Sequence, residues 1–280
     1  MRIGRFGSAV LLGGPLVFLA IFFLIPFGWL ALDSFQRGGT PTLANYAKLA
    51  TDGHYWRILF LTFEISLWST VLCFALGYPV AYFLNFYVSS RLARKLIYII
   101  LVTPLFTSNI VRAFGWIIML GREGIINQGL MSAGIINVPF QLLYTKWSII
   151  LALSYTLLPF MVLAISSVLQ DINRSVIEAA RDLGANPLMT FFKITFPLSI
   201  PGVAAGTLIV FTLAVSAYVT PSIMSGGRSI VMPMLIFQQY MVVFDSSFGA
   251  ALSVLLLGMT LLLIVAYSLL LNRAAMRRFA

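Results

Sequence analysis

Long apolar stretches alternate with short polar segments along the whole chain. Six of these stretches reach the roughly 20 residues that an α-helix needs to cross the hydrocarbon core of a bilayer. The pattern therefore predicts an all-α membrane protein with six transmembrane helices, in which residues 1–280 form a single transmembrane domain. The predicted spans lie at about residues 9–32, 59–87, 96–120, 147–169, 200–221 and 248–272.

Several of the predicted spans contain prolines, among them Pro79 in the second, Pro104 in the third and Pro159 in the fourth. A proline removes one backbone hydrogen bond and bends a helix, and a membrane helix tolerates it where its neighbours or a cavity satisfy the freed carbonyl group. Bent helices around a central path suit a transporter. Prolines are also simply more frequent in membrane helices than in soluble ones, and both explanations stay open at this point.

The composition supports the membrane assignment. Hydrophobic residues make up 60% of the chain, charged residues make up 9%, and the mean hydropathy is +0.99. Soluble domains carry about 25% charged residues. The apolar region that follows Arg2 and Arg5 is too long for a signal peptide, so we expect an uncleaved first helix. The single Cys73 excludes an internal disulfide.

The positive charges gather on one side of the predicted topology. Eleven of the 18 Lys and Arg residues lie in the two terminal segments, in the second-to-third connection and in the fourth-to-fifth connection. The positive-inside rule therefore predicts that both termini and the fourth-to-fifth connection face the cytoplasm. This placement beside apolar spans also argues against nucleic acid as the reason for the net charge of +10.

The connection between the fourth and fifth spans has the pattern of two short helices that meet at a tight turn. Asn173 or Ser175 is placed to cap the first helix, and Gly184 stands where a helix end calls for a left-handed residue. Asn186 is placed to cap the second helix, and Pro187 takes its first position, where a missing N–H group costs nothing. We expect this hairpin to lie at the membrane surface.

The first helix of this hairpin has the features of a docking surface. Arg174 and Glu178 are four residues apart, and Glu178 and Arg181 are three apart, so charge pairs are expected along one side. Small apolar residues on the same helix let another backbone approach closely, which suits a groove on a soluble partner. This predicted ridge consists of Val176, Ala179, Ala180 and Leu183.

The spacing in this segment resembles the EAA signature of permease subunits in bacterial ABC importers. Glu178-Ala179-Ala180 is followed by three residues and Gly184, and then by nine residues and Ile194-Thr195-Phe196-Pro197. The usual Leu before the closing proline is Phe196 here. The resemblance implies a cytoplasmic coupling segment, at about residues 173–197, that docks into an ATPase subunit. It assigns this coupling role to Glu178, Ala179, Ala180, Asp182, Gly184, Pro187 and Pro197.

Other stretches are similar to the spermidine/putrescine-type branch of the same family. The resemblance implies a type I ABC importer permease fold in a bacterial inner membrane, and a polyamine or related amine as the solute. The branch also contains importers of opines, other amino compounds and iron complexes. The implied partners are a second permease subunit, two ATPase subunits and a periplasmic substrate-binding protein. The similar stretches are residues 42–46, 104–108, 158–161, 218–219 and 248–251, with Val111, Arg112 and Trp116.

The chain has no pattern for binding a nucleotide. A P-loop needs a Gly-Lys pair ahead of Ser or Thr, and no Gly-Lys pair occurs in this sequence. We therefore expect a subunit that is not an enzyme and that binds no cofactor or metal, with ATP and Mg²⁺ on the partner ATPase subunits. An intramembrane protease is disfavoured because it would need a nucleophile with its base or a metal motif, and the single His54 lies in an outer loop.

Ionisable groups inside the spans mark a candidate solute path. Glu64 is the only carboxylate in a predicted span, and Arg112 is the only guanidinium group there. Such groups face the bundle interior or a water-filled cavity. Because their helices run in opposite directions, we expect the two side chains to lie at similar depth and to pair. The pair would either shape the outer part of the path, with Glu64 attracting a cation, or tie two helices together.

Three further residues are candidates for the surface of this path. Asn109, Tyr155 and Tyr218 offer polar or aromatic groups to a passing amine, including cation–π contacts. Helix packing is the alternative role for each of them. The alternative class, an ion-coupled secondary transporter, would usually need more intramembrane acids or histidines than Glu64 alone supplies.

Overall fold

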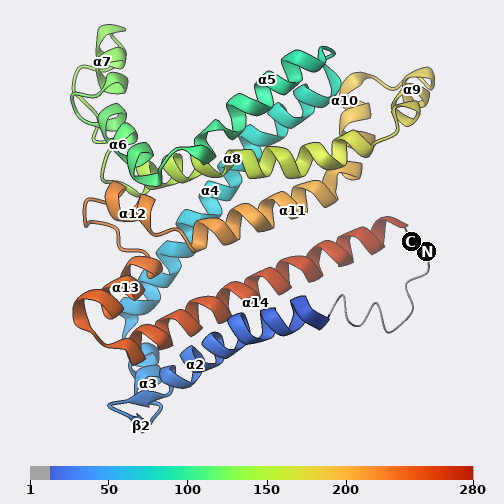
Figure 1. Ribbon diagram of the computed structural model, residues 1–280. Coiled ribbons are helices and arrows are strands. Elements are labelled where there is room, and N and C mark those ends of the chain that lie inside the picture. Colours follow the sequence, from blue (N-terminus) through green and yellow to red (C-terminus); the bar gives the residue numbers. More distant parts are fainter. Residues whose placement is uncertain (1–12, 280) are drawn as a thin grey trace. The chain divides into compact units, whose positions relative to one another are not determined.

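The computed structural model describes residues 13–279, and for Arg181 and residues 271–279 it describes only the backbone. Arg2, Arg5 and the first residues of the predicted first span lie outside the described part. This part is almost entirely helical, with a single two-stranded sheet (Figure 1). The N-terminal half contains η1 (Ala20–Leu24), α2 (Ile25–Ser34), β1 (Gln36–Arg37), β2 (Thr40–Pro41), α3 (Ala44–Thr51), α4 (Gly53–Phe86), α5 (Arg91–Val102), η2 (Thr103–Phe106), α6 (Asn109–Leu120) and α7 (Ile125–Ser132). The C-terminal half contains α8 (Lys146–Asp171), α9 (Arg174–Asp182), α10 (Pro187–Thr190), η3 (Phe191–Thr195), α11 (Phe196–Val215), α12 (Val219–Met224), α13 (Met232–Gln238), η4 (Gln239–Val243) and α14 (Ser246–Phe279).

Five helices of the described chain are long and apolar enough to cross a membrane. A sixth candidate is a pair of helical segments, Arg91–Phe106 and Asn109–Ser132, which bend by 100° at the break between them. The predicted all-α class is therefore confirmed, with six spans when the bent pair counts as one. The five unbroken helices are Gly13–Ser34, Gly53–Phe86, Lys146–Asp171, Pro187–Val215 and Ser246–Leu270.

The third predicted span, at about residues 96–120, is not one continuous helix. α5 passes into the 3₁₀ turn η2, where Pro104 contributes no N–H group. Thr107 and Ser108 then adopt extended backbone angles before α6 begins. The break therefore falls within residues 104–108, one of the stretches that carry the family resemblance. Pro79 and Pro159, in contrast, lie inside the continuous helices α4 and α8.

The chain divides into two compact units. The first comprises the described residues up to Arg57 together with Leu235–Leu261, and the second comprises Ile58–Met234 together with the residues from Leu262 onward. Helices α4 and α14 each contribute residues to both units. The assignment of the whole chain to a single transmembrane domain stays a prediction.

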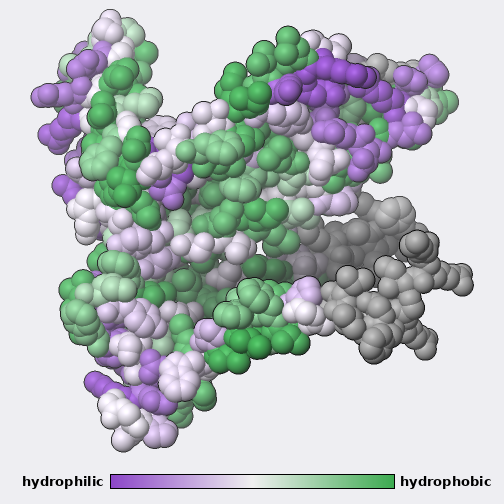
Figure 2. All heavy atoms as spheres, in the orientation of Figure 1, coloured by the Kyte–Doolittle hydropathy of each residue, from purple (hydrophilic) through white to green (hydrophobic). Residues whose placement is uncertain are grey.

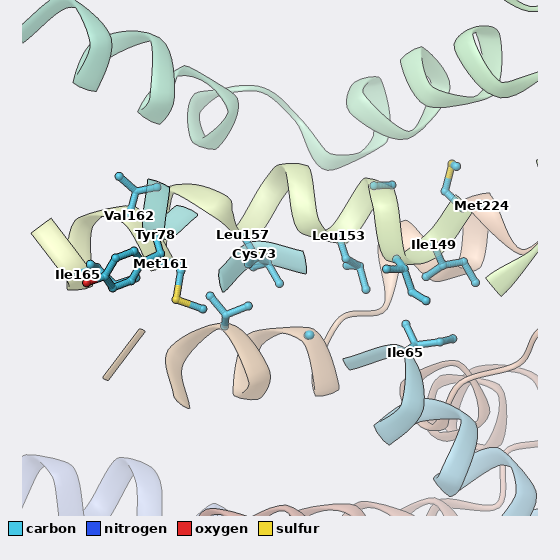
Figure 3. Close-up of a cluster of buried hydrophobic side chains, with 14 of the residues drawn as sticks. Ile65, Cys73, Tyr78, Ile149, Leu153, Leu157, Met161, Val162, Ile165 and Met224 are labelled. Atoms are coloured by element: carbon cyan, nitrogen blue, oxygen red, sulfur yellow. The ribbon is translucent and has the colours of Figure 1, made fainter. Parts of the chain in front are cut away.

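The core of the second unit is built on α8, whose buried side chains include Leu153 and Met161 and point toward α11 (Figure 3). The backbones of α8 and α11 approach closely because α11 carries glycines at the contact. A Cβ atom at Gly202 would lie 2.9 Å from the carbonyl oxygen of Ala164, and one at Gly206 would lie 2.8 Å from Sδ of Met161. Small residues at such contacts allow the dense van der Waals packing that drives helix association in membranes.

In the first unit, side-chain hydrogen bonds hold the loop that follows α2. Nδ2 of Asn45 donates to the carbonyl oxygens of Ser34 (3.1 Å) and Gln36 (2.9 Å). The hydroxyl groups of Ser34 and Tyr46 lie 2.8 Å apart. Asn45 and Tyr46 belong to the stretch at residues 42–46 that carries part of the family resemblance, and their role here is to close the loop.

Candidate functional site

The hairpin before the fifth span begins with a cap at Asn173. The Oδ1 atom of Asn173 accepts a hydrogen bond from the N–H group of Ser175 (3.0 Å), and its carbonyl oxygen accepts one from Val176 (3.1 Å). Of the two predicted caps, Asn173 is therefore the one that forms. The cap satisfies N–H groups that the start of α9 leaves without helical partners.

The turn of the hairpin depends on the backbone of Gly184. Its φ angle is +83°, which confirms the predicted left-handed residue. The N–H group of Ala185 donates to the carbonyl oxygen of Ala180 (3.0 Å), which is the long bond of a Schellman motif. No atom lies within 4 Å of the place where a Cβ atom at Gly184 would stand. Backbone conformation, rather than lack of space, therefore favours glycine at this turn.

The second half of the hairpin is not the separate short helix that the sequence predicts. Asn186 does cap it, because its Oδ1 atom accepts from the N–H group of Met189 (2.7 Å), and Pro187 is the first helical residue. The helix then continues without a break through η3 and α11, from Pro187 to Val215. The turn is therefore joined to the fifth span by one continuous helix.

A π-helical turn lets this run pass the last proline of the signature. In η3, the N–H group of Phe196 donates to the carbonyl oxygen of Phe191, five residues earlier. Pro197 follows directly and has no N–H group to donate. The π-helical turn replaces the hydrogen-bonding pattern of an α-helix at the place where Pro197 supplies no N–H donor. This explains why the helix continues there.

The helix α9 has one face against the rest of the unit and one face exposed. Ile177 and Ala180 are buried, whereas Glu178 and Ala179 are exposed. The prediction that Ala180 belongs to an outward ridge is therefore wrong, because it packs within the chain. Leu183, at 89% exposure, stands at the outer end of the helix. The exposed face of the hairpin, called the outer face below, consists of Val176, Glu178, Ala179, Asp182, Leu183, Leu188 and Met189.

The predicted ion pair between Arg174 and Glu178 does not form. Nη2 of Arg174 donates instead to the backbone carbonyl oxygen of Asn85 (3.4 Å). This carbonyl lies in the last turn of α4, where the helix leaves acceptors open, so the contact ties α9 to α4. Glu178 borders a cleft of about 160 Å³ together with residues of α4 and α10. The side chain of Arg181 lies outside the described part, so the second predicted pair stays a prediction.

An aromatic cluster that the sequence analysis did not single out joins the base of the hairpin to α4. The ring centroid of Phe191 lies 5.2 Å from that of Tyr82 and 5.7 Å from that of Tyr78. The ring of Phe196 lies 5.6 Å from that of Tyr78, whose hydroxyl group is 2.9 Å from the hydroxyl of Ser199. The tyrosines are four residues apart and so share one face of α4, a spacing that could have predicted the cluster. The replacement of the usual Leu by Phe196 adds a ring to this contact.

The predicted pairing of Glu64 with Arg112 is wrong. Oε1 of Glu64 accepts a hydrogen bond from Nζ of Lys146, at the start of α8, and the two atoms are 2.5 Å apart. Arg112 donates to the side chain of Asn109 in its own helix. The expected pairing assumed a straight third span, and the 100° bend at the break before α6 removes the basis for comparing the two depths.

Two tryptophans stand beside the pair of Glu64 and Lys146. The ring of Trp147 lies 5.9 Å from Nζ of Lys146, and the rings of Trp68 and Trp147 are 6.1 Å apart. The side chains of Glu64 and Lys146 are 40% and 39% exposed. An accessible carboxylate beside aromatic rings has the chemistry that binds an alkylammonium group. Sequence reasoning missed Lys146 because it lies just outside the fourth predicted span, at residues 147–169.

The remaining predicted path residues fall into two places. Asn109, Arg112 and Tyr155 lie together. Arg112 donates a hydrogen bond to Asn109 and interacts electrostatically with Tyr155. The ring of Tyr155 packs edge-on against that of Trp116, with the centroids 5.8 Å apart. Tyr218 lies half-buried just before α12. Whether these side chains contact a solute stays a prediction. No group of three or more His, Cys, Asp or Glu side chains that could hold a metal lies together among the described residues.

Comparison with known proteins decides the family. Residues 73–278 match the family described as binding-protein-dependent transport system inner membrane component. The chain belongs to this family. The spermidine/putrescine transport system permease protein PotB of Salmonella typhimurium (strain SL1344) is 35% identical to this permease over 238 residues, which are 83% of this chain and 81% of the relative. The protein of the same name from Haemophilus influenzae is 32% identical over 256 residues, covering 89% and 88% of the two chains.

Solved structures show the same fold. A chain of a bacterial ABC transporter involved in the import of the acidic polysaccharide alginate superposes with a TM-score of 0.77, with 17% identity and 95% of each chain covered. A chain of the methionine ABC transporter MetNI, in an inward-facing conformation, has a TM-score of 0.57, with 19% identity and coverage of 78% and 94%. The expected type I ABC importer permease fold is therefore confirmed, and the chain is an integral membrane subunit of an ABC importer.

The match also separates the two parts of the candidate site. The matched range includes the whole hairpin and the group around Arg112, whereas Glu64 lies before its first residue. The hairpin thus belongs to the part of the permease that is common to the family. Of the pair formed by Glu64 and Lys146, only Lys146 lies within that range.

Proposed function

We propose that this permease forms half of the path of an ATP-driven importer for a polyamine or related amine, and that its hairpin binds an ATPase subunit. The observation that carries the coupling role is the part of the outer face on α9, which exposes apolar side chains such as Leu183 outside the helices that are long enough to span a membrane. Exposed apolar surface of this kind marks a contact with another protein. The carboxylates Glu178 and Asp182 add polar groups to the same contact.

The geometry provides two connections between that contact and the membrane helices. The turn at Gly184 leads into the continuous helix Pro187–Val215, and the aromatic cluster at Tyr78 holds the base of this helix against α4. A movement imposed on the outer face by an ATPase would thus reach α4 and α11 together. Both helices pack with α8 in the core of the second unit, so three spans would share the movement.

The partners and cofactors follow from the family. A permease that hydrolyses no nucleotide needs ATPase subunits, which would bind the ATP and Mg²⁺. Related importers support this assembly, since one solved alginate transporter is in complex with its solute-bound periplasmic protein. We propose two ATPase subunits, a periplasmic substrate-binding protein and a second, distinct permease subunit as the partners of this chain.

The orientation follows from the role of the hairpin. An ATPase is supplied with ATP in the cytoplasm, so the outer face belongs on the cytoplasmic side of a bacterial inner membrane. The basic residues of the hairpin and of the loop before α5 agree with this side by the positive-inside rule. With six spans, the N- and C-termini would both be cytoplasmic.

The amine is proposed on two grounds. Relatives at 35% identity over most of the chain are named for spermidine and putrescine transport. In addition, the accessible carboxylate of Glu64 binds the ammonium group of Lys146, which lies 5.9 Å from the ring of Trp147, and this combination suits an alkylammonium group. The ammonium group of Lys146 already binds this carboxylate. A passing amine would therefore compete with Lys146 for Glu64.

ATP-dependent uptake by the purified assembly tests the proposal. The permease, isolated from its own host with its associated subunits, is placed in proteoliposomes with the binding protein outside and ATP inside. We expect accumulation of labelled spermidine or putrescine that stops without ATP and continues when ion gradients are abolished. Accumulation driven by an ion gradient alone would contradict the importer class, and uptake only of opines or iron complexes would contradict the amine.

A matched pair of variants tests the docking role of the outer face. Leu183→Ser removes an apolar side chain that is 89% exposed on the hairpin, and Leu43→Ser removes one that is 66% exposed in the loop after α2. We expect the ATPase subunit to be lost from the purified assembly only with Leu183→Ser. Equal retention of the ATPase in both variants would show that the hairpin is not its contact.

A further inference from the structure

A second surface of this permease combines charge with an apolar groove. One face of α5 and η2, called the α5 stripe below, borders a cavity of about 580 Å³. Its residues recur every three or four positions and so line one side of the helix. The stripe begins with Arg91, Arg94 and Lys95 and continues through Ile99, Val102 and Phe106.

The basic end of the stripe is built to hold an anion. None of the described residues that border the cavity is acidic, so its three cations have no carboxylate beside them there. Arg94 is fixed by a hydrogen bond from Nη2 to the carbonyl oxygen of Val88 (2.8 Å), whereas Arg91 and Lys95 are exposed. The start of α5 also adds the partial positive charge of a helix N-terminus. Figure 2 shows the band of hydrophilic side chains where α5 begins.

The other end of the stripe is apolar and open. Ile99 is 53% exposed and Phe106 is 87% exposed, so the described residues leave most of Phe106 and about half of Ile99 uncovered. Tyr98 marks the boundary between the two ends, and its hydroxyl group accepts a hydrogen bond from Nε2 of Gln170 in α8 (3.4 Å). This hydrogen bond connects the stripe to α8.

The dimensions of the stripe match a lipid. From Arg91 to Phe106 the helix rises by about 22 Å, at roughly 1.5 Å per residue. Half of the hydrocarbon core of a bilayer is about 15 Å thick, so the stripe is long enough for a headgroup and one leaflet of acyl chain. A protein partner would have to present acidic groups at one end of the stripe and apolar groups along the rest, whereas an anionic phospholipid has this arrangement by its constitution.

We propose that the α5 stripe is a binding site for an anionic phospholipid. The phosphate group lies among Arg91, Arg94 and Lys95, and an acyl chain lies along Ile99, Val102 and Phe106. Basic pockets at the membrane surface are known to hold such headgroups. The site goes beyond the solute path and the ATPase contact, and it does not depend on which solute is carried.

Lipid retention by the purified importer tests this site. The assembly is equilibrated in nanodiscs of phosphatidylcholine and phosphatidylglycerol in equal amounts, and the lipids that remain bound are counted by native mass spectrometry. Wild-type permease should retain phosphatidylglycerol in preference to phosphatidylcholine. Each basic residue near an anionic lipid changes binding by about fivefold, so the double variant Arg91→Gln with Lys95→Gln should reduce the preference by at least about fivefold. Arg94 is left in place because it also holds the loop before α5.

The matched control removes two positive charges elsewhere in the second unit. Arg122→Gln with Arg228→Gln changes two exposed side chains that do not border the cavity, and it should leave the preference unchanged. Phe106→Ser should weaken the retention of phosphatidylglycerol although it changes no charge. Free glycerol phosphate, which has no acyl chain, should not displace the bound lipid. An equal loss in both double variants, no preference in the wild type, or a preference that disappears once the partner subunits are bound would overturn the proposal.

Discussion

Replacement of Gly184 tests whether the hairpin depends on a left-handed backbone. The φ angle at this position is +83°, and no atom lies within 4 Å of an added Cβ atom. A side chain at position 184 therefore causes no clash, and its cost is that of an L-residue in the left-handed region, about 1–2 kcal/mol. Gly184→Ala isolates this cost, and Gly184→Val should exceed it because a β-branched residue resists the conformation most. Gly184→Asn is the matched variant, since Asn adds more atoms than Ala but tolerates the left-handed region.

The amide of Ala185 reports directly on the turn. Its N–H group is bonded to the carbonyl oxygen of Ala180 only while the turn is formed. A cost of about 1 kcal/mol changes the population of the opened turn about fivefold, so hydrogen exchange at Ala185 should accelerate about fivefold in Gly184→Ala. The acceleration should be larger in Gly184→Val and smaller in Gly184→Asn.

The same series should act on coupling in the assembled importer. Solute-stimulated ATP hydrolysis and uptake in proteoliposomes should fall in the order glycine, asparagine, alanine, valine at position 184, because the outer face is presented only by a formed turn. If Gly184→Asn were as damaging as Gly184→Val, the bulk of the side chain would matter, and the argument from backbone handedness would be refuted. Full coupling in Gly184→Val would refute it as well.

Three further predictions concern the path, the core and the aromatic cluster. Glu64→Gln should lower uptake of a cationic amine in proteoliposomes at unchanged yield of folded protein, whereas Lys146→Gln should keep the carboxylate available to the amine; normal uptake in Glu64→Gln would count against a role in the path. Gly202→Leu should destabilise the purified permease by about 1–3 kcal/mol, seen as a lower melting temperature, because overpacking forces α8 and α11 apart. Tyr78→Phe should cost about 1 kcal/mol through the lost bond to Ser199 while coupling persists, but Tyr78→Ala should also reduce solute-stimulated ATP hydrolysis; equal coupling in the two variants would contradict a role for the ring contacts.

Local features of the hairpin could be predicted from the sequence because they depend on neighbouring residues. The cap at Asn173, the left-handed Gly184 and the cap at Asn186 each involve partners within five residues along the chain. The number and class of the spans follow from hydrophobic length in the same way.

Contacts between distant residues could not be predicted in this way. The partner of Glu64 is Lys146 rather than Arg112, and the partner of Arg174 is the backbone of Asn85 rather than Glu178. The pairing of Glu64 with Arg112 assumes a straight third span, and the pairing of Arg174 with Glu178 considers only residues within the helix α9. The bend before α6 changes which side chains can meet.

The sequence by itself determined the membrane class, the approximate spans and the hairpin with its left-handed turn, since hydrophobic length and backbone preference act over a few residues at a time. Only the tertiary structure decided that Ala180 faces inward, that Pro187 begins a helix continuous with the fifth span, and that Tyr78 and Phe191 clamp this helix to α4. The physical reason is that these outcomes depend on how whole helices pack. A side chain is buried or exposed, paired or unpaired, by what another helix brings against it.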